Sequence, residues 1–472
     1  MRVIRLNGET GRNHLFEWKE KEKEYLKLLD QKYSFSEALK ALDEIDWDFK
    51  NFNTQYLSHK FHPYPARFIP QIPLTFIKLF TEEGDTVLDP FCGCGTTLVE
   101  ALLNSRNAVG NDLNPLAVLI SKVKTTLIPE EKLHYLHRKL QERKKGDPDS
   151  AKIARVLKNL PNRKISKIFD ETTIEKLELL REVLLELRIE GENELCDLGS
   201  VALSATVWSL VENRSTGDVE EQFLKKLRLM ESELKKMAAL IKHPPRVEVL
   251  NDDARKLAVA SGSVDLIVTS PPYVNAFDYY RSHMYNMIWL DMDFGAFKKQ
   301  EIGGHSQFVN NRFRLLSRYL GDMLRALIEM NRVLKKGHLC VIVIGNSSLE
   351  YEAIESHKFF AAMAACTGFK NLKTIPRSID KTRKYTSSEI GKIEDEYLIL
   401  LQKTAEVEVS ASDDDFVTTV VEQQMHSFRE KVKEKPGTGV RGKKPSEERL
   451  KKNIEKLDEA IAKIAEDIRL EK

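Results

Sequence analysis

Short runs of branched and apolar residues recur along the chain, separated by polar loops and by amphipathic stretches. Runs of this kind are typical of strands that are buried on both faces of a parallel sheet. They occur near residues 86–88, 108–110, 247–250, 264–268, 339–344, 369–375 and 396–401. The last two indicate a terminal antiparallel hairpin, and a helix is predicted over 315–333. The pattern therefore predicts an α/β fold.

Helical spacing of apolar residues dominates the rest of the chain. Residues 1–55 read as a helical lead-in that packs on the sheet, and 128–243 as a helical insertion too long for a loop. Residues 405–445 are predicted to be a flexible basic linker. Residues 446–472 form an amphipathic helix with a heptad seam. The seam could dock on the chain's own body or pair two chains in a homodimer, and the pattern leaves both outcomes open.

The net charge of the 472-residue chain is only +2, so any footprint for nucleic acid must be local. The first part of the insertion, 131–167, holds twelve basic and four acidic residues. Such a concentration can neutralise phosphates, although a solvated helix face would look the same.

Five scattered cysteines show no paired metal spacing, so the sequence predicts no metal site. Free thiols without a disulfide pattern suit the reducing cytoplasm. The N-terminus does not resemble a signal peptide, and no apolar run looks long enough to span a membrane. These features predict a cytoplasmic protein.

The stretch VDLIVTSPPY, 264–273, joins a buried strand to a rigid corner. Proline lacks an N–H and has a fixed φ, so Pro271 and Pro272 end the strand in an extended turn. The Ser270 hydroxyl and the local carbonyls can accept hydrogen bonds from an amino group, and Tyr273 offers a flat face for a planar ring. An ordinary strand-to-loop turn is the alternative reading.

A second stretch, TVLDPFCGCGTT at 86–97, joins a strand to a helix through Gly93 and Gly95. Glycines allow the backbone to approach a ligand, and the helix start supplies free N–H groups. Asp112 follows the next strand, where an acid can bind ribose hydroxyls. The run is not GxGxxG, so a dinucleotide is not indicated.

Together, DPFCGCGTT and TSPPY resemble the S-adenosylmethionine-dependent DNA methyltransferases that act on exocyclic amino groups. The segments HPYPARF at 62–68 and NDDA at 251–254 resemble two further motifs of that family, in the expected order. The resemblance implies a Rossmann-like methyltransferase domain over 56–127 and 244–404, with S-adenosylmethionine as cofactor. It implies cofactor contacts by His62, Tyr64, Pro65, Arg67, Asp89, Pro90, Phe91, Gly93, Gly95, Thr96, Thr97, Asp112, Leu113, Asn114, Asp253 and Ala254.

The same resemblance implies that Ser270, Pro271, Pro272 and Tyr273 hold a flipped base in double-stranded DNA. Serine before Pro-Pro-Tyr accompanies cytosine N4 more often than adenine N6, so we expect N4-cytosine methylation. The alternatives are adenine N6, a guanine amino group in RNA, and a DNA-binding subunit without activity. Contacts to nucleic acid are expected from Tyr279, Arg281, Arg377, Lys381, Arg383, Lys384, Lys144 and Lys145.

We expect the insertion to read the DNA groove. Deleting residues 131–240 should then abolish sequence preference while cofactor binding stays measurable. A restriction or defence partner is a further candidate, which the sequence does not test.

Overall fold

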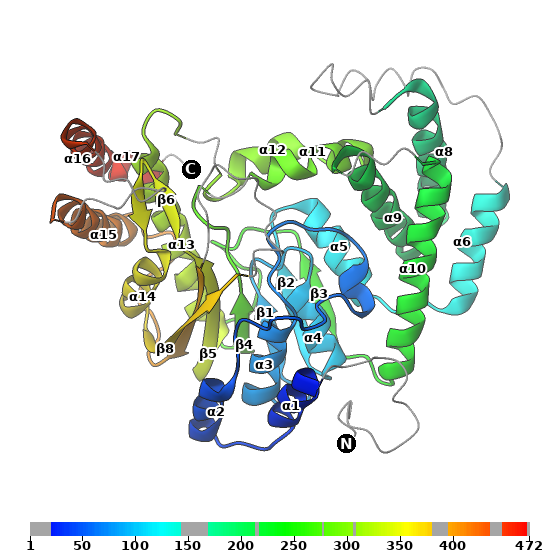
Figure 1. Ribbon diagram of the computed structural model, residues 1–472, viewed down its shortest axis with the longest axis horizontal. Coiled ribbons are helices and arrows are strands. Elements are labelled where there is room, and N and C mark those ends of the chain that lie inside the picture. Colours follow the sequence, from blue (N-terminus) through cyan, green and yellow to red (C-terminus); the bar gives the residue numbers. More distant parts are fainter. Residues whose placement is uncertain are drawn as a thin grey trace.

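The computed structural model describes residues 20–142, 169–212, 217–275, 278–304, 308–379, 395–434 and 446–469. Its centre is a seven-stranded sheet (Figure 1). The strands are β1 (Thr86–Asp89), β2 (Asn107–Asn111), β3 (Val247–Leu250), β4 (Val264–Thr269), β5 (Leu334–Gly345), β8 (Phe369–Ser378) and β9 (Asp395–Lys403). All seven predicted strands are present.

The strand order is β3-β2-β1-β4-β5-β9-β8. The first five strands are mutually parallel, whereas β9 runs antiparallel to β5 and to β8. The chain builds outward from β1 to β3, then returns to place β4 on the other side of β1. Ligands of open α/β sheets bind where the order reverses in this way, beyond the carboxyl ends of the strands. The predicted α/β fold with a final hairpin is confirmed.

Strand β5 is continuously apolar because its side chains point alternately to the two faces of the sheet and helices cover both faces. Leu339, Val341 and Val343 face one layer of helices, and Cys340 and Ile342 face the other. One layer contains α1 (Glu20–Leu29), α2 (Phe35–Ala41), α3 (Gln71–Phe80) and α4 (Thr96–Leu103). The other contains α13 (Arg312–Val333) and α14 (Ser356–Cys366). The N-terminal helices thus pack on the sheet.

The insertion is helical, as predicted, and lies at one side of the molecule (Figure 1). Its described helices are α6 (Glu130–Glu142), α8 (Glu171–Ile189), α9 (Asn193–Glu212) and α10 (Val219–Leu240). They share one hydrophobic core with α5 (Pro115–Thr125), the short helix η2 (Leu57–Lys60), α11 (Tyr279–Trp289) and α12 (Phe294–Gln300). The insertion therefore shares its hydrophobic core with helices from the rest of the chain.

Among the described residues, α9 is the one helix long and apolar enough to cross a membrane by length and composition. The sequence reading had found no such run. Most of α9 is buried within the protein, where it packs against α5, α8, α10 and α11. Its apolar character is accounted for by this core position.

The C-terminal region differs from the expectation. Within the predicted linker, Asp414–Glu434 form helix α15, so that prediction is wrong for these residues. Apolar residues at helical spacing, from Val417 to Val432, bury one face of α15. The last stretch forms α16 (Glu447–Ala462) and α17 (Ile464–Arg469), which pack on α13 and α15. The heptad seam thus packs against the chain's own body, with Leu457, Ile464 and Ile468 buried, and a homodimer through it stays a prediction.

A buried acid behind the sheet leads to a prediction about pH. Glu100 accepts hydrogen bonds from Tyr56 (2.7 Å) and pairs with His59 (2.8 Å), and burial raises the pKa of its carboxyl to about 8. Burial keeps His59 neutral by lowering its pKa well below the usual value. Between about pH 4.5 and 8 folded Glu100 holds a proton that it releases in the unfolded chain, so its contribution to stability falls as pH rises. Below about pH 6.5 neutral His59 contributes the opposite slope, so the net fall is expected between about pH 6.5 and 8.

We expect Glu100→Gln to remove this contribution, which reaches at most about 1.4 kcal/mol per pH unit. Urea unfolding at pH 5, 6, 7 and 8 measures the slope. The exposed Glu24→Gln on α1 serves as the control and should keep the wild-type slope. Equal slopes for wild type and Glu100→Gln would contradict the assignment.

Candidate active site

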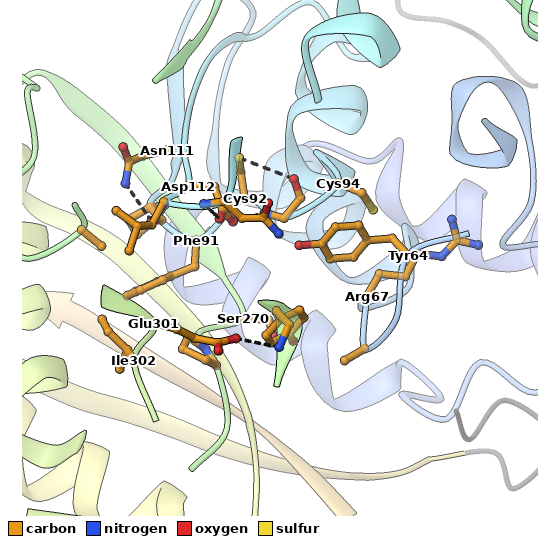
Figure 2. A pocket seen from close by; sticks show the side chains of 18 of the residues that line it. Tyr64, Arg67, Phe91, Cys92, Cys94, Asn111, Asp112, Ser270, Glu301 and Ile302 are labelled. Atoms are coloured by element: carbon orange, nitrogen blue, oxygen red, sulfur yellow. Dashed lines mark hydrogen bonds between the residues drawn. The ribbon is translucent and has the colours of Figure 1, made fainter. Parts of the chain in front are cut away.

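The two chemical motifs line one cavity at the point where the strand order reverses. The cavity encloses about 820 Å³ and is partly open to solvent. Gly93 and Asp112 come from the loops after β1 and β2, and Ser270 and Pro272 from the corner after β4. Figure 2 shows Ser270 and Glu301 on one side of this space, with Phe91 and Asp112 across from them.

Asp89, at the end of β1, joins the two motifs. Its buried carboxylate accepts hydrogen bonds from Thr97 Oγ1 (2.8 Å) at the start of α4 and from Thr269 Oγ1 (2.7 Å) at the end of β4. The Phe91 N–H donates as well, at 3.2 Å. Burial raises the pKa of Asp89 to about 7 although these donors favour its charged form. This carboxyl fixes the glycine loop relative to the proline corner.

Asp112 shapes the same loop from the other side. Its carboxylate accepts the N–H groups of Gly93 (2.8 Å) and Asn114 (2.9 Å), and burial raises its pKa to about 6. Each carboxylate oxygen keeps a second lone pair, so Asp112 can still accept hydroxyl donors from a ligand. Gly93 has φ of +49° and lies against the ring of Tyr64, where a side chain would crowd the cavity.

Gly95 precedes α4 and offers a stability test. Its φ is +75°, and an added Cβ would lie 2.8 Å from Ser121 Oγ and 3.1 Å from Ser121 Cα. Strain and overpacking together predict that Gly95→Ala costs about 2–5 kcal/mol and weakens cofactor binding. Gly84→Ala is the matched control, because Gly84 has φ of +90° but open space around its Cβ position. Denaturant titration would contradict this prediction if both variants lost equal stability.

The proline corner is held from behind. Tyr319 on α13 donates its hydroxyl to the Pro272 carbonyl at 2.9 Å. The Ser270 hydroxyl lies 3.5 Å from the Tyr273 hydroxyl, which donates to Glu396 on β9 at 3.0 Å. Pro271 is buried, and its neighbours Ser270 and Pro272 form the wall of the cavity.

Fourteen of the predicted site residues line this one cavity. They are Tyr64, Arg67, Pro90, Phe91, Gly93, Thr96, Asp112, Leu113, Asn114, Asp253, Ala254, Ser270, Pro272 and Tyr279. The Asp253 carboxylate is already paired with Arg255 at 2.7 Å. Six separate segments of the sequence thus converge on one cavity.

Five predicted cofactor contacts are buried and do not line the cavity, so their contact with a cofactor stays a prediction. They are His62, Pro65, Asp89, Gly95 and Thr97. The His62 Nδ1–H donates to the Pro63 carbonyl (2.7 Å), and Nε2 accepts from Ser204 on α9 (2.9 Å). Burial lowers the pKa of His62 to about 3, so the ring is neutral. These residues support the cavity, and His62 ties its wall to the insertion.

The predicted nucleic-acid contacts lie in different surroundings: some are at the surface or in the cavity, one is buried, and the others lie outside the described residues. Arg281 is exposed on α11, and Tyr279 lines the cavity. Arg377 is buried and pairs with Glu396 at 2.6 Å, so its guanidinium is already engaged within the protein and its contact with DNA stays a prediction. Lys144, Lys145, Lys381, Arg383 and Lys384 lie outside the described residues.

Sequence reasoning missed several lining residues. They are Ala66, Phe68, Cys92, Cys94, Asn111, Phe297, Glu301 and Ile302. Ala66, Phe68 and the two cysteines fall within the quoted motifs and could have been included. Glu301 has no local signal: it accepts the Tyr279 N–H at 2.6 Å, and burial raises its pKa to about 8. Only the fold brings this acid to the corner.

The residues present suit a nucleoside-type cofactor. The cavity lies beyond the carboxyl ends of parallel strands, where open α/β sheets bind ligands. Phe91, Ile302 and Ala254 provide apolar walls for a planar base, and Asp112 provides acceptors for ribose hydroxyls. Within the described part of the chain, no group of three or more His, Cys, Asp or Glu side chains could hold a metal ion.

The strand order and the cavity at its reversal define a Rossmann-like methyltransferase domain. A family model described as DNA methylase, of the N6/N4 type, matches residues 6–123 and 264–459. The chain belongs to this family of amino-group DNA methyltransferases. The matched segments include the N-terminal helices and α15 but leave out the helical insertion.

Two curated relatives are Type II methyltransferases. M.MvaI from Kocuria varians is 30% identical over 287 residues, which is 53% of this chain and 61% of that protein. M.BsoBI from Geobacillus stearothermophilus is 23% identical over 349 residues, 66% of each. The matches thus span just under two thirds of these relatives. A solved methyltransferase from Methanosarcina mazei covers 70% of this chain and 98% of its own, at 11% identity and a TM-score of 0.31.

Proposed function

We propose that this protein transfers a methyl group from S-adenosylmethionine to the exocyclic N4 amino group of a cytosine flipped out of double-stranded DNA. The observation that carries the proposal is the shared cavity, in which the glycine loop and the Ser-Pro-Pro corner face the same space. Family membership supports an amino group in DNA as the acceptor. Ser270, in place of an acid, favours cytosine N4 over adenine N6.

The cofactor, when bound, supplies a methyl group activated on a sulfonium. Gly93, Phe91 and Asp112 would hold it on one side of the cavity. On the other side, Ser270 Oγ and the Pro271 carbonyl would accept hydrogen bonds from the amino group. An amino nitrogen conjugated with the ring is a poor nucleophile, so these acceptors orient its lone pair and stabilise the positive charge that develops on it. No strong base is required, because the methylated aminium is very acidic.

The target base must leave the duplex, at a cost of a few kcal/mol. Stacking on the Tyr273 ring would return about 1–3 kcal/mol. We place the reaction in the cytoplasm, where the DNA substrate is found and where Cys92, Cys94, Cys196 and Cys340 stay reduced as buried free thiols.

The test is incubation with labelled S-adenosylmethionine and either duplex DNA or RNA, followed by nucleoside analysis. We expect label in DNA as N4-methylcytosine, incorporated far more slowly by Ser270→Ala. N6-methyladenine would overturn the choice of base. Label in RNA alone would overturn the DNA assignment, and label in neither would leave a DNA-binding subunit.

Arg281 provides a test of the DNA-facing side. It is exposed on the same helix as Tyr279, which lines the cavity, so we expect it to contact phosphate. Arg281→Ala should weaken DNA binding across sequences and reduce the salt slope by about 1, with cofactor affinity unchanged. The control is Lys370→Ala, because Lys370 is exposed on β8, an edge strand of the sheet. Fluorescence anisotropy over a range of salt would contradict the assignment if both variants matched wild type.

A further inference from the structure

Behind the proline corner, a hydrogen-bonded chain runs from Ser270 to the final hairpin. The Ser270 hydroxyl lies 3.5 Å from the Tyr273 hydroxyl, which donates to Glu396 Oε1 at 3.0 Å. The other oxygen of Glu396 pairs with Arg377 Nη1 at 2.6 Å, and Arg377 Nε donates to the Trp47 carbonyl at 3.0 Å. Ser270 and Tyr273 belong to the TSPPY corner, whereas Glu396, Arg377 and Trp47 lie outside the motifs quoted for the family.

The two charged members are fixed by the sheet. Arg377 and Glu396 are opposite each other in the antiparallel pair β8–β9, and both side chains are largely buried. Opposed charges hold each other at such a cross-strand position. The Glu396 carboxylate therefore acts as an acceptor at a fixed place beside Tyr273.

The number of protons available fixes which group donates and which accepts in each of these hydrogen bonds. A tyrosine hydroxyl has one proton, and Tyr273 donates it to Glu396. Burial and the charge of Glu396 raise the pKa of Tyr273 well above its usual value, so that proton stays on the phenol. Toward Ser270, the Tyr273 oxygen can then only accept.

We propose that Glu396, acting through Tyr273, directs the Ser270 proton away from the cavity, so that Ser270 presents lone pairs to the target amino group. This inference rests on the proposed function and assigns Glu396 and Arg377 as positioning residues. A serine hydroxyl can donate or accept, and only the accepting state suits an amino group. These hydrogen bonds make the neutral serine accept a hydrogen bond from the amino group, as an aspartate at this position would. The 3.5 Å contact is longer than an ideal O–H···O bond and is of the kind that shortens when substrate binds.

The closing experiment is a double-mutant cycle on kcat, with the cofactor dissociation constant measured in parallel. Tyr273→Phe keeps the ring but removes the acceptor for Ser270, and we expect kcat to fall about 3- to 10-fold with cofactor affinity unchanged. Glu396→Gln should cost more, because its amide can donate to the Tyr273 oxygen and turn the tyrosine proton toward Ser270. In the Tyr273→Phe background, Glu396→Gln should cost nothing further.

Tyr33→Phe is the matched control, since its hydroxyl only meets the Leu28 carbonyl far from the cavity. Unchanged kcat in Tyr273→Phe would overturn the proposal. So would a cost of Glu396→Gln that is equal in both backgrounds, because a merely structural role in holding Arg377 persists without the hydroxyl. Absence of methyl transfer by the wild-type protein would instead overturn the proposed function, so the two failures are distinguishable.

Discussion

Replacing Ser270 by alanine is expected to lower kcat for methyl transfer by about 100- to 1,000-fold. Ser270 provides the one side-chain hydroxyl of the TSPPY corner that lines the cavity, so the substitution removes an acceptor for the amino group. Cofactor affinity should change little, because the predicted cofactor contacts lie on the glycine loop and after β2. Single-turnover kinetics and cofactor titration separate the two effects.

The control for this variant is Ser263→Ala, just before β4, whose hydroxyl donates to the Ala260 carbonyl on the exposed surface. It should keep wild-type kcat. A Ser270→Ala protein with kcat within about threefold of wild type would show that the corner does not orient the nucleophile. A parallel loss of cofactor affinity would mean that Ser270 holds the cofactor instead.

Deleting residues 131–240 is expected to prevent folding, contrary to the expectation from sequence that cofactor binding survives. Helix α9 shares the core of α5 and α11, and Ser204 on α9 bonds to His62 Nε2 (2.9 Å) and to Asn286 Nδ2 (2.9 Å). Each fully buried Leu or Val contributes about 1.5–3 kcal/mol, whereas a whole domain is stable by only about 5–15 kcal/mol. The free energy lost with the buried side chains of these helices therefore exceeds the stability of the domain.

Calorimetry should then show no cooperative transition for the deletion, and cofactor titration no binding. Ser204→Ala is the milder counterpart, which should stay folded and lose about 1–3 kcal/mol because buried partners are left unpaired. A deletion protein that unfolds cooperatively and binds cofactor would show that the insertion is a module. In that case its role in choosing the DNA sequence could be tested by removal.

The sequence located the strands and the two motifs because both are encoded locally. Branched apolar runs such as 264–268 have few alternatives to a buried strand, and two prolines or two glycines restrict the backbone within a few residues. Helix α15 carried a local signal too, in apolar residues from Val417 to Val432, but the polar stretches on either side of it suggested a linker.

What the sequence by itself determined is the set of candidate groups: the serine of the proline corner, a glycine turn and an acid after the second strand. The tertiary structure decided which of these residues face the cavity and which hold it in place. Asp89 and His62 proved to be supports, Glu301 and Glu396 reached the corner from distant segments, and the C-terminal seam turned inward. The reason is that strand order and side-chain burial arise from contacts between residues far apart in the chain, which no local pattern records.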